Sequence, residues 1–314
     1  MLLDVVGLVL SLVLLAVGGD RFILAIARLA GSLRVRPTVV GALVGGFGTS
    51  VAELIVAALA SVRASPQLAL GSLVGSIIAN VCLALVAAAL ISPVFVDSRT
   101  VRREAPVSMA SVILFAALAV GGVSFVEGAV MLVALAPAVL LLLASARRNA
   151  PGDELGAEVV ELLAIASQSR RSQAVRALVS LAVMLGGAEL MVTSSVGLAD
   201  RLGLAQGFTG LTLVGIGTSA PLIASSIQAA RRGEHDLVVG NVLGGNLFIA
   251  LGGGAIVGLL TAGTVRGVGT VSLWLMAGAV VASWLAMARG NILRRWEAGL
   301  LLLAYVAMLP FLGR

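Results

Sequence analysis

The chain has 314 residues, of which 60% are hydrophobic and 11% charged, and its mean hydropathy is +1.12. Soluble globular domains have about 45–50% apolar and about 25% charged residues, so this composition excludes them and predicts an integral membrane protein. The formal net charge is +6, and all 21 basic residues are arginines. These arginines gather between apolar runs and not in a stripe with aromatic residues, which favours topology determinants over nucleic-acid binding.

Ten apolar segments are long enough to cross about 30 Å of hydrocarbon. The first begins at the N-terminus without the basic region or cleavage site of a signal peptide, so we interpret it as a membrane helix. We therefore expect an all-α integral membrane protein with ten transmembrane helices. In chain order the segments cover residues 2–29, 37–62, 67–91, 104–120, 124–145, 174–199, 206–231, 235–260, 269–288 and 293–311.

The longest polar connection covers residues 146–173 and contains Pro151, Gly152 and four acidic residues before Arg170-Arg171. We interpret it as a short cytoplasmic linker, too small for a regulatory domain. It divides the chain into a first half, 1–145, and a second half, 174–314.

The two halves repeat. Gly48-Thr49-Ser50 recurs as Gly217-Thr218-Ser219, and Gly71-x-x-x-Gly75 recurs as Gly240-x-x-x-Gly244, both at a sequence offset of 169. Upstream, Gly18-Gly19 matches Gly186-Gly187 at an offset of 168, as if one residue were gained in the connection. Because each half holds five helices, the second copy enters the membrane from the opposite side. Such inverted repeats are typical of transporters with a binding site near the midplane.

The segment after Gly45 places a carboxylate and two hydroxyl groups inside a membrane helix. A charged side chain at the bilayer centre costs about 2.5–3.5 kcal/mol on insertion scales, and such residues usually serve transport. Thr49 and Ser50 precede Glu53 by four and three residues, so the three side chains share one helix face. Hard cations prefer such oxygen ligands, which makes Glu53 the leading functional candidate.

Two other acidic residues interrupt apolar segments. Asp20 follows the first pair of glycines, and Glu189 follows the matching pair in the second half. We expect both near the outer interface, in contacts at helix ends or between helices.

These motifs resemble the two alpha repeats of the calcium/cation antiporter superfamily, typified by sodium/calcium exchangers. The resemblance covers essentially the whole chain, with alpha motifs at 41–80 and 210–249. It rests on Gly48-Thr49-Ser50-x-x-Glu53, Gly75-Ser76-x-x-x-Asn80, Gly217-Thr218-Ser219-Ala220-Pro221 and Gly240-Asn241-x-x-Gly244-x-Asn246-Leu247-Phe248.

The resemblance implies that the second, third, seventh and eighth helices form a midplane ion site for sodium and calcium, without a cofactor. The positions that match ligands of the family are Glu53, Thr49, Ser50, Ser76 and Asn80 in the first repeat, Thr218 and Ser219 in the second, and the carbonyl oxygens of Gly46 and Gly215 in helix breaks before each Gly-Thr-Ser. The hydroxyl group of Thr218 or Ser219 could instead have a structural role and no ion to bind, as a donor to the backbone carbonyl four residues earlier in its own helix.

The second repeat departs from the family pattern. Leu222 stands where a glutamate normally follows the proline, Ile249 stands at the position that matches Asn80, and Gly245 replaces a serine. The first repeat therefore keeps its ligands, whereas the second lacks a carboxylate.

We expect a secondary active cation antiporter of the sodium/calcium exchanger type, working by alternating access in the cell membrane, and not an enzyme. Ca²⁺ takes six to eight oxygen ligands, and Glu53 alone would neutralise only one of its two charges in a dry site. Two alternatives follow: a monovalent cation/proton antiporter, and a transport-deficient paralogue that acts as a membrane scaffold. The partners we expect are the lipid bilayer and inorganic cations; the sequence leaves the oligomeric state open.

The distribution of arginines predicts the topology. Connections after the odd-numbered helices hold 16 of the 21 arginines, so the positive-inside rule places that side in the cytoplasm and both termini outside. These arginines are Arg28, Arg34, Arg36, Arg99, Arg102, Arg103, Arg147, Arg148, Arg170, Arg171, Arg176, Arg231, Arg232, Arg289, Arg294 and Arg295.

We predict that a cysteine introduced by Gly152→Cys reacts with a membrane-impermeant thiol reagent only after the cells are opened, because the linker is cytoplasmic. Cys82, the single native cysteine, lies in an apolar run and provides the background measurement. Labelling of Gly152→Cys from outside intact cells would contradict the assigned orientation.

Overall fold

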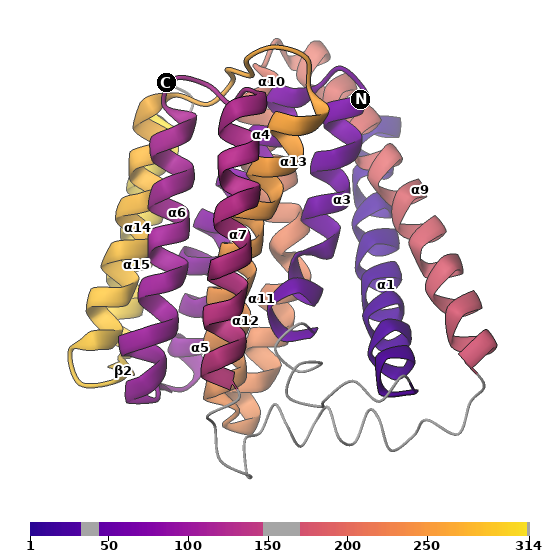
Figure 1. Ribbon diagram of the computed structural model, residues 1–314. Coiled ribbons are helices and arrows are strands. Elements are labelled where there is room, and N and C mark those ends of the chain that lie inside the picture. The colour runs from indigo at the N-terminus through magenta and orange to yellow at the C-terminus, as the bar shows by residue number, and fades with distance from the viewer. Residues whose placement is uncertain (33–43, 147–169, 313–314) are drawn as a thin grey trace.

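The computed structural model describes residues 1–32, 44–146 and 170–312, and most of them are helical (Figure 1). The helices of the first repeat are α1 (Leu2–Ser32), α3 (Thr49–Val62), α4 (Pro66–Ala79), α5 (Leu85–Ile91), α6 (Ala105–Ala119) and α7 (Phe125–Ala146). Those of the second repeat are α9 (Arg170–Leu202), α10 (Gln206–Thr209), α11 (Gly215–Arg232), α12 (His235–Leu247), α13 (Gly254–Leu260), α14 (Thr270–Ala288) and α15 (Arg295–Met308).

Short π-helical turns and one 3₁₀ turn join or extend these helices. The π turns are η1 (Val44–Gly48), η2 (Asn80–Ala84), η3 (Thr100–Glu104), η4 (Gly210–Val214) and η5 (Phe248–Gly253), and the 3₁₀ turn is η6 (Leu309–Phe311). The predicted breaks before each Gly-Thr-Ser are therefore wide helical turns and not interruptions, since η1 runs directly into α3 and η4 into α11. Such π turns inside α-helices occur frequently at functional sites.

Seven helical stretches of the described residues are long and apolar enough to cross a membrane. They are Leu2–Leu29, Pro66–Ile91, Phe125–Leu142, Arg170–Leu202, Gln206–Arg232, His235–Leu260 and Thr270–Ala288. The other three predicted segments coincide with shorter helices: Gly46–Val62, whose predicted start lies outside the described residues, α6 and α15. The all-α membrane fold is confirmed, and the number of ten spans stays a prediction.

Two helical stretches form the centre of the molecule. Pro66–Ile91 and His235–Leu260 are buried along most of their length, whereas Phe125–Leu142 is mainly exposed at the periphery. Helices α1 and α9 lie side by side at one flank, and α14 and α15 lie at the opposite flank (Figure 1). The only strands among the described residues are β1 (Val94–Phe95) and β2 (Ile292–Leu293), which pair antiparallel with Val94 opposite Leu293.

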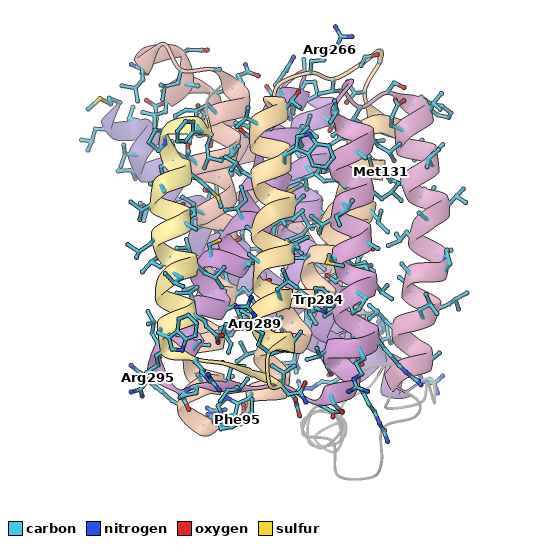
Figure 2. The ribbon with its side chains drawn as sticks, turned by 90° about the vertical axis from the view of Figure 1, so that its left-hand side faces the viewer. Phe95, Met131, Arg266, Trp284, Arg289 and Arg295 are labelled. Carbon is cyan, nitrogen blue, oxygen red and sulfur yellow. The ribbon has the colours of Figure 1, made fainter. Side chains whose placement is uncertain are left out.

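Both termini lie at the same end of the molecule, as an even number of crossings requires (Figure 1). Arg289 and Arg295 lie at the opposite end, and Arg266 lies at the end near the termini (Figure 2). This separation agrees with the partition of arginines between alternate connections; which end faces the cytoplasm stays a prediction.

Glycines let the central helices touch backbone to backbone. A Cβ atom built at Gly75 in α4 would lie 2.0 Å from the carbonyl oxygen of Leu211 in η4, and one at Gly71 would lie 2.1 Å from that of Gly207. Helices in lipid gain association energy from such close packing at small residues. The glycine-rich motifs therefore define the contact between α4 and the second repeat.

We predict that Gly75→Ala destabilises the folded protein by about 1–3 kcal/mol, because the added methyl group forces α4 and η4 apart. Gly278→Ala is the matched control, since a Cβ at Gly278 in α14 meets nothing within 4 Å. Thermal unfolding of both variants in the same detergent measures the difference. Equal midpoints for Gly75→Ala and the wild type would contradict the backbone contact.

Candidate cation site

Glu53 is the buried carboxylate of the candidate site. It lies in the second turn of α3, its side chain is 3% exposed, and its Oε2 atom has no hydrogen-bond partner among the described residues. An unpaired buried carboxylate is very unfavourable, so it must be either protonated or balanced by a cation. Glu53 therefore has the environment expected of a cation ligand.

Two hydroxyl groups lie at the start of the same helix. Thr49 donates from Oγ1 to the carbonyl oxygen of Gly46 at 3.2 Å. The Ser50 hydroxyl is 3.3 Å from the same carbonyl and 3.2 Å from the carbonyl oxygen of Gly245 in α12. These contacts place the start of α3 directly against the second repeat.

A second cluster joins α4 to α11. The Ser76 hydroxyl lies 3.2 Å from the carbonyl oxygen of Gly215 and 3.1 Å from Oγ1 of Thr218. Thr218 also makes the alternative contact to the carbonyl four residues earlier, Val214, at 3.0 Å. Ser219 does not; its hydroxyl instead donates across the interface to the carbonyl oxygen of Ser76 at 3.5 Å.

The two clusters obey one pseudo-twofold relation. Ser50 donates to the carbonyl of Gly245, and Ser219 donates to the carbonyl of Ser76. At the offset of 169, Ser219 is the counterpart of Ser50 and Gly245 is the counterpart of Ser76. The equivalent hydrogen bond is therefore made from the first repeat to the second and from the second to the first, as inverted repeats require. The offset read from the sequence is therefore a spatial relation at the site.

Backbone contacts repeat this relation. A Cβ at Gly46 would lie 3.1 Å from the Cα of Gly244, and a Cβ at Gly215 would lie 2.7 Å from the Cα of Gly75. Gly215 and Gly244 are the counterparts of Gly46 and Gly75 at the same offset. The carbonyls of Gly46 and Gly215, both predicted to face the site, thus belong to equivalent helix crossings.

Asn80 makes a contact that the sequence did not predict. Its Nδ2 atom donates to Oδ1 of Asn246 in α12 at 3.0 Å, and both side chains are fully buried. Oδ1 of Asn80 and Nδ2 of Asn246 have no partner in the described part of the chain. Asn246 was not among the candidate ligands expected from the sequence, because its counterpart in the first repeat is the apolar Ile77. The available signal was its place in the motif Gly240-Asn241-x-x-Gly244-x-Asn246.

In the second repeat, apolar side chains stand at the positions that match the acid and the amide of the first: Leu222 matches Glu53, and Ile249 matches Asn80. Leu222 and Ile249 are 4% and 0% exposed. A Cβ at Gly245 would lie 3.2 Å from the Ser50 hydroxyl and 3.3 Å from that of Thr49, so this missing side chain would have reached the site. Within the described residues, no three His, Cys, Asp or Glu side chains gather at any one point.

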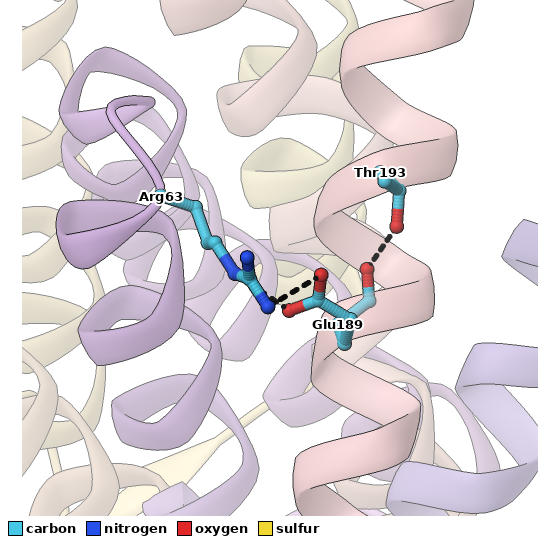
Figure 3. Close-up of polar contacts among 3 residues, drawn as sticks. All are labelled: Arg63, Glu189 and Thr193. Atoms are coloured by element: carbon cyan, nitrogen blue, oxygen red, sulfur yellow. Dashed lines mark hydrogen bonds and ion pairs between the residues drawn. The ribbon is translucent and has the colours of Figure 1, made fainter.

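The two outlying acids differ from each other. Glu189 makes the predicted contact between helices, with Arg63 at the end of α3 (Figure 3). Asp20 lies beyond the midpoint of α1, in the half away from the chain termini, whereas Glu189 lies in the half of the antiparallel α9 that is nearer the termini. The expectation that both lie near the same interface is therefore wrong, because the repeats are inverted.

Comparison with known proteins identifies the family. Residues 3–144 and 172–313 match the family described as sodium/calcium exchanger protein. A putative antiporter, CaxA of Alkalimonas amylolytica, is 30% identical over 98% of this chain and 97% of its own. The sodium/calcium exchanger MaX1 of Methanosarcina acetivorans is 27% identical over 97% of each chain.

A solved structure has the same fold. The sodium-calcium exchanger NCX_Mj, soaked with Na⁺ and Sr²⁺, superposes with a TM-score of 0.67 at 28% identity, over 99% of this chain and 98% of that one. The match of both halves to one family agrees with the duplication seen at the site. The chain belongs to the sodium/calcium exchanger family and is a transporter.

Proposed function

We propose that this protein is a secondary active cation antiporter of the sodium/calcium exchanger type, which carries its cation beside Glu53 at the crossing of α3, α4, α11 and α12. The observation that carries the proposal is the buried Oε2 atom of Glu53, which lacks a hydrogen-bond partner in the described part of the chain. The relatives MaX1 and NCX_Mj, which are named as exchangers of sodium and calcium, support it.

The remaining ligands would be neutral oxygens. Thr49, Ser50, Ser76, Thr218 and Ser219 offer hydroxyl groups, Asn80 offers an amide oxygen without a partner among the described residues, and Gly46 and Gly215 offer carbonyls. Hard cations bind such oxygens. A transport-deficient scaffold would gain nothing from a buried carboxylate, so this set favours transport.

A single carboxylate favours a second candidate, exchange of a monovalent cation with protons. Buried Leu222 and Ile249 supply no charge, so a divalent ion beside Glu53 would keep one unneutralised positive charge in surroundings of low dielectric constant. Na⁺ or H⁺ would be neutralised fully. Ca²⁺ would depend on additional carbonyl or water oxygens.

We predict that Glu53→Gln lowers cation affinity and flux by more than about 100-fold while the protein stays folded. Losing one partner of a buried charge pair costs about 3–5 kcal/mol, and every 1.4 kcal/mol is about tenfold in affinity. Flux of Na⁺, K⁺, Ca²⁺ and H⁺ in proteoliposomes, with thermal unfolding alongside, measures both effects. Glu127→Gln is the control, because that carboxylate lies at the start of α7, hydrogen-bonded to Ser124. Normal flux in Glu53→Gln would place the site elsewhere.

The choice between divalent and monovalent cations is tested by restoring the missing acid. We predict that Leu222→Glu, which corresponds to Glu53 at the offset of 169, raises Ca²⁺ affinity at least about tenfold, or about 1.4 kcal/mol. Leu222→Gln separates the added charge from the added oxygen. Calorimetric titration with Ca²⁺ gives the result. Tight Ca²⁺ binding by the wild type, unchanged in Leu222→Glu, would show that one carboxylate with neutral oxygens is sufficient.

A further inference from the structure

An ion pair links the end of α3 to the middle of α9. Nε of Arg63 lies 3.0 Å from Oε2 of Glu189, and Nη2 of Arg63 lies 3.0 Å from Oε1 (Figure 3). The contact is two-pronged but partly exposed, with 59% and 39% of the two side chains accessible. The Thr193 hydroxyl, one turn later in α9, donates to the backbone carbonyl of Glu189 and not to its carboxylate, which is left to pair with Arg63 (Figure 3).

Contacts between α1 and α9 define which residues correspond in these two helices. A Cβ at Gly18 would meet Met184, and a Cβ at Gly187 would meet Leu15. Gly187 is the counterpart of Gly18, and Met184 that of Leu15, at the offset of 169. A Cβ at Gly186, the residue matched to Gly18 by the offset of 168, meets nothing within 4 Å. The alignment of the glycine pairs at 168 is therefore wrong, and 169 holds here as at the site.

At this offset the ion pair has a counterpart. Arg63 corresponds to Arg232 at the end of α11, and Glu189 corresponds to Asp20 in α1. Each arginine thus corresponds to an arginine, and each carboxylate to a carboxylate. However, Asp20 and Arg232 form no ion pair with any residue that the structure describes, and both are exposed.

The surrounding helices show the same asymmetry. Helix α9 contacts α3 more extensively than α1 contacts α11, although the repeat relates these two pairs. Helices α1 and α9 are themselves closely packed: a Cβ at Gly7 would lie 2.2 Å from the Ser194 hydroxyl, and Arg201 pairs with Asp4 at 3.0 Å. The pair α1/α9 therefore has the packing of one unit, placed asymmetrically between α3 and α11.

We propose that the two ion pairs form alternately: Arg63 with Glu189 in the conformation described here, and Asp20 with Arg232 in the opposite conformation of the transport cycle. In transporters built from inverted repeats, one part of the molecule rocks against the other around a fixed site. If the two repeats exchange conformations in that movement, the Arg63–Glu189 contact is lost and the equivalent Asp20–Arg232 contact forms. The Arg63–Glu189 pair holds the α1/α9 unit against α3, and the Asp20–Arg232 pair would hold it against α11. The inference rests on the proposed antiporter function, because it requires two conformations.

Cross-linking tests the exchange in the full chain. In a Cys82→Ala background, one variant carries Arg63→Cys with Glu189→Cys and another carries Asp20→Cys with Arg232→Cys. An arginine–glutamate pair spans more than the roughly 3.5–4.5 Å between Cβ atoms of a disulfide, so a short bifunctional thiol reagent is used. The control pair is Asp20→Cys with Arg231→Cys, which moves one thiol by about 100° around α11.

The yields of the two cross-links are measured in proteoliposomes with NaCl, with CaCl₂ and with neither. We expect them to change in opposite directions, each cross-link to stop flux, and the control pair to react weakly in all conditions. Yields that rise and fall together, or an Asp20/Arg232 yield no higher than the control in every condition, would overturn the exchange.

Charge variants supply an independent readout. Arg63→Glu should raise the Asp20/Arg232 cross-link about two- to fivefold, the range expected for a partly exposed ion pair, and the double change Arg63→Glu with Glu189→Arg should restore it. Arg266→Gln is the control: Arg266 lies at the end of the molecule near the chain termini (Figure 2), where α3 also ends (Figure 1), and removing its charge should not change the cross-link yield. Failure of the double change to restore the yield would show that the Arg63–Glu189 pair does not set the equilibrium.

Flux of the Cys82→Ala protein separates this inference from the proposed function. Normal flux with cross-links that do not alternate would refute the ion-pair exchange and leave the antiporter intact. Alternating cross-links in a protein that carries no cation under any gradient would refute the antiporter and leave the exchange of ion pairs.

Discussion

The close approach of helix backbones at glycine is the constraint on which the site depends. Where Gly46 meets Gly244 and Gly75 meets Gly215, a single methyl group would collide with the neighbouring backbone. Only at such short separations does a serine hydroxyl of one helix reach a carbonyl of the other, as Ser50 does with Gly245. The crossings therefore create both the packing of the four central helices and the hydrogen bonds of the Gly-Thr-Ser motifs across the repeats, and lipid offers no competing hydrogen bonds.

The scaffold is symmetric, but its chemistry is not. Matching glycines, threonines and serines occupy equivalent places in both repeats. Glu53, however, has no acidic counterpart among the described residues, because the matching position holds the buried, apolar Leu222. Packing tolerates this difference, since leucine and isoleucine fill the space without leaving a buried polar atom unsatisfied. A divalent ion beside a single carboxylate would keep one unneutralised charge, whereas a monovalent ion would not; for this reason we propose that Leu222 and Ile249 influence which cation is preferred.

The contacts outside the site have a different character. The Arg63–Glu189 pair is partly exposed, and exposed ion pairs contribute only about 0–1 kcal/mol. A weak contact of this kind biases an equilibrium without locking it, whereas a fully buried pair costs about 3–5 kcal/mol when one partner is removed. The glycine contacts between α1 and α9 instead keep those two helices together, so that a small electrostatic preference acts on the pair as a whole.

Hydropathy alone determined the membrane class, and spacing alone determined the inverted duplication and the place of Glu53, because these properties depend on residue type and periodicity along one chain. Partners across the fold were decided only by tertiary structure. Ser219 donates to Ser76 and not within its own helix, Asn246 joins Asn80, and Arg63 reaches Glu189, far along the chain. The register of α1 and α9 is the clearest case: two adjacent glycines look equivalent in a sequence, but only Gly187 faces α1, since a helix presents each residue in a different direction.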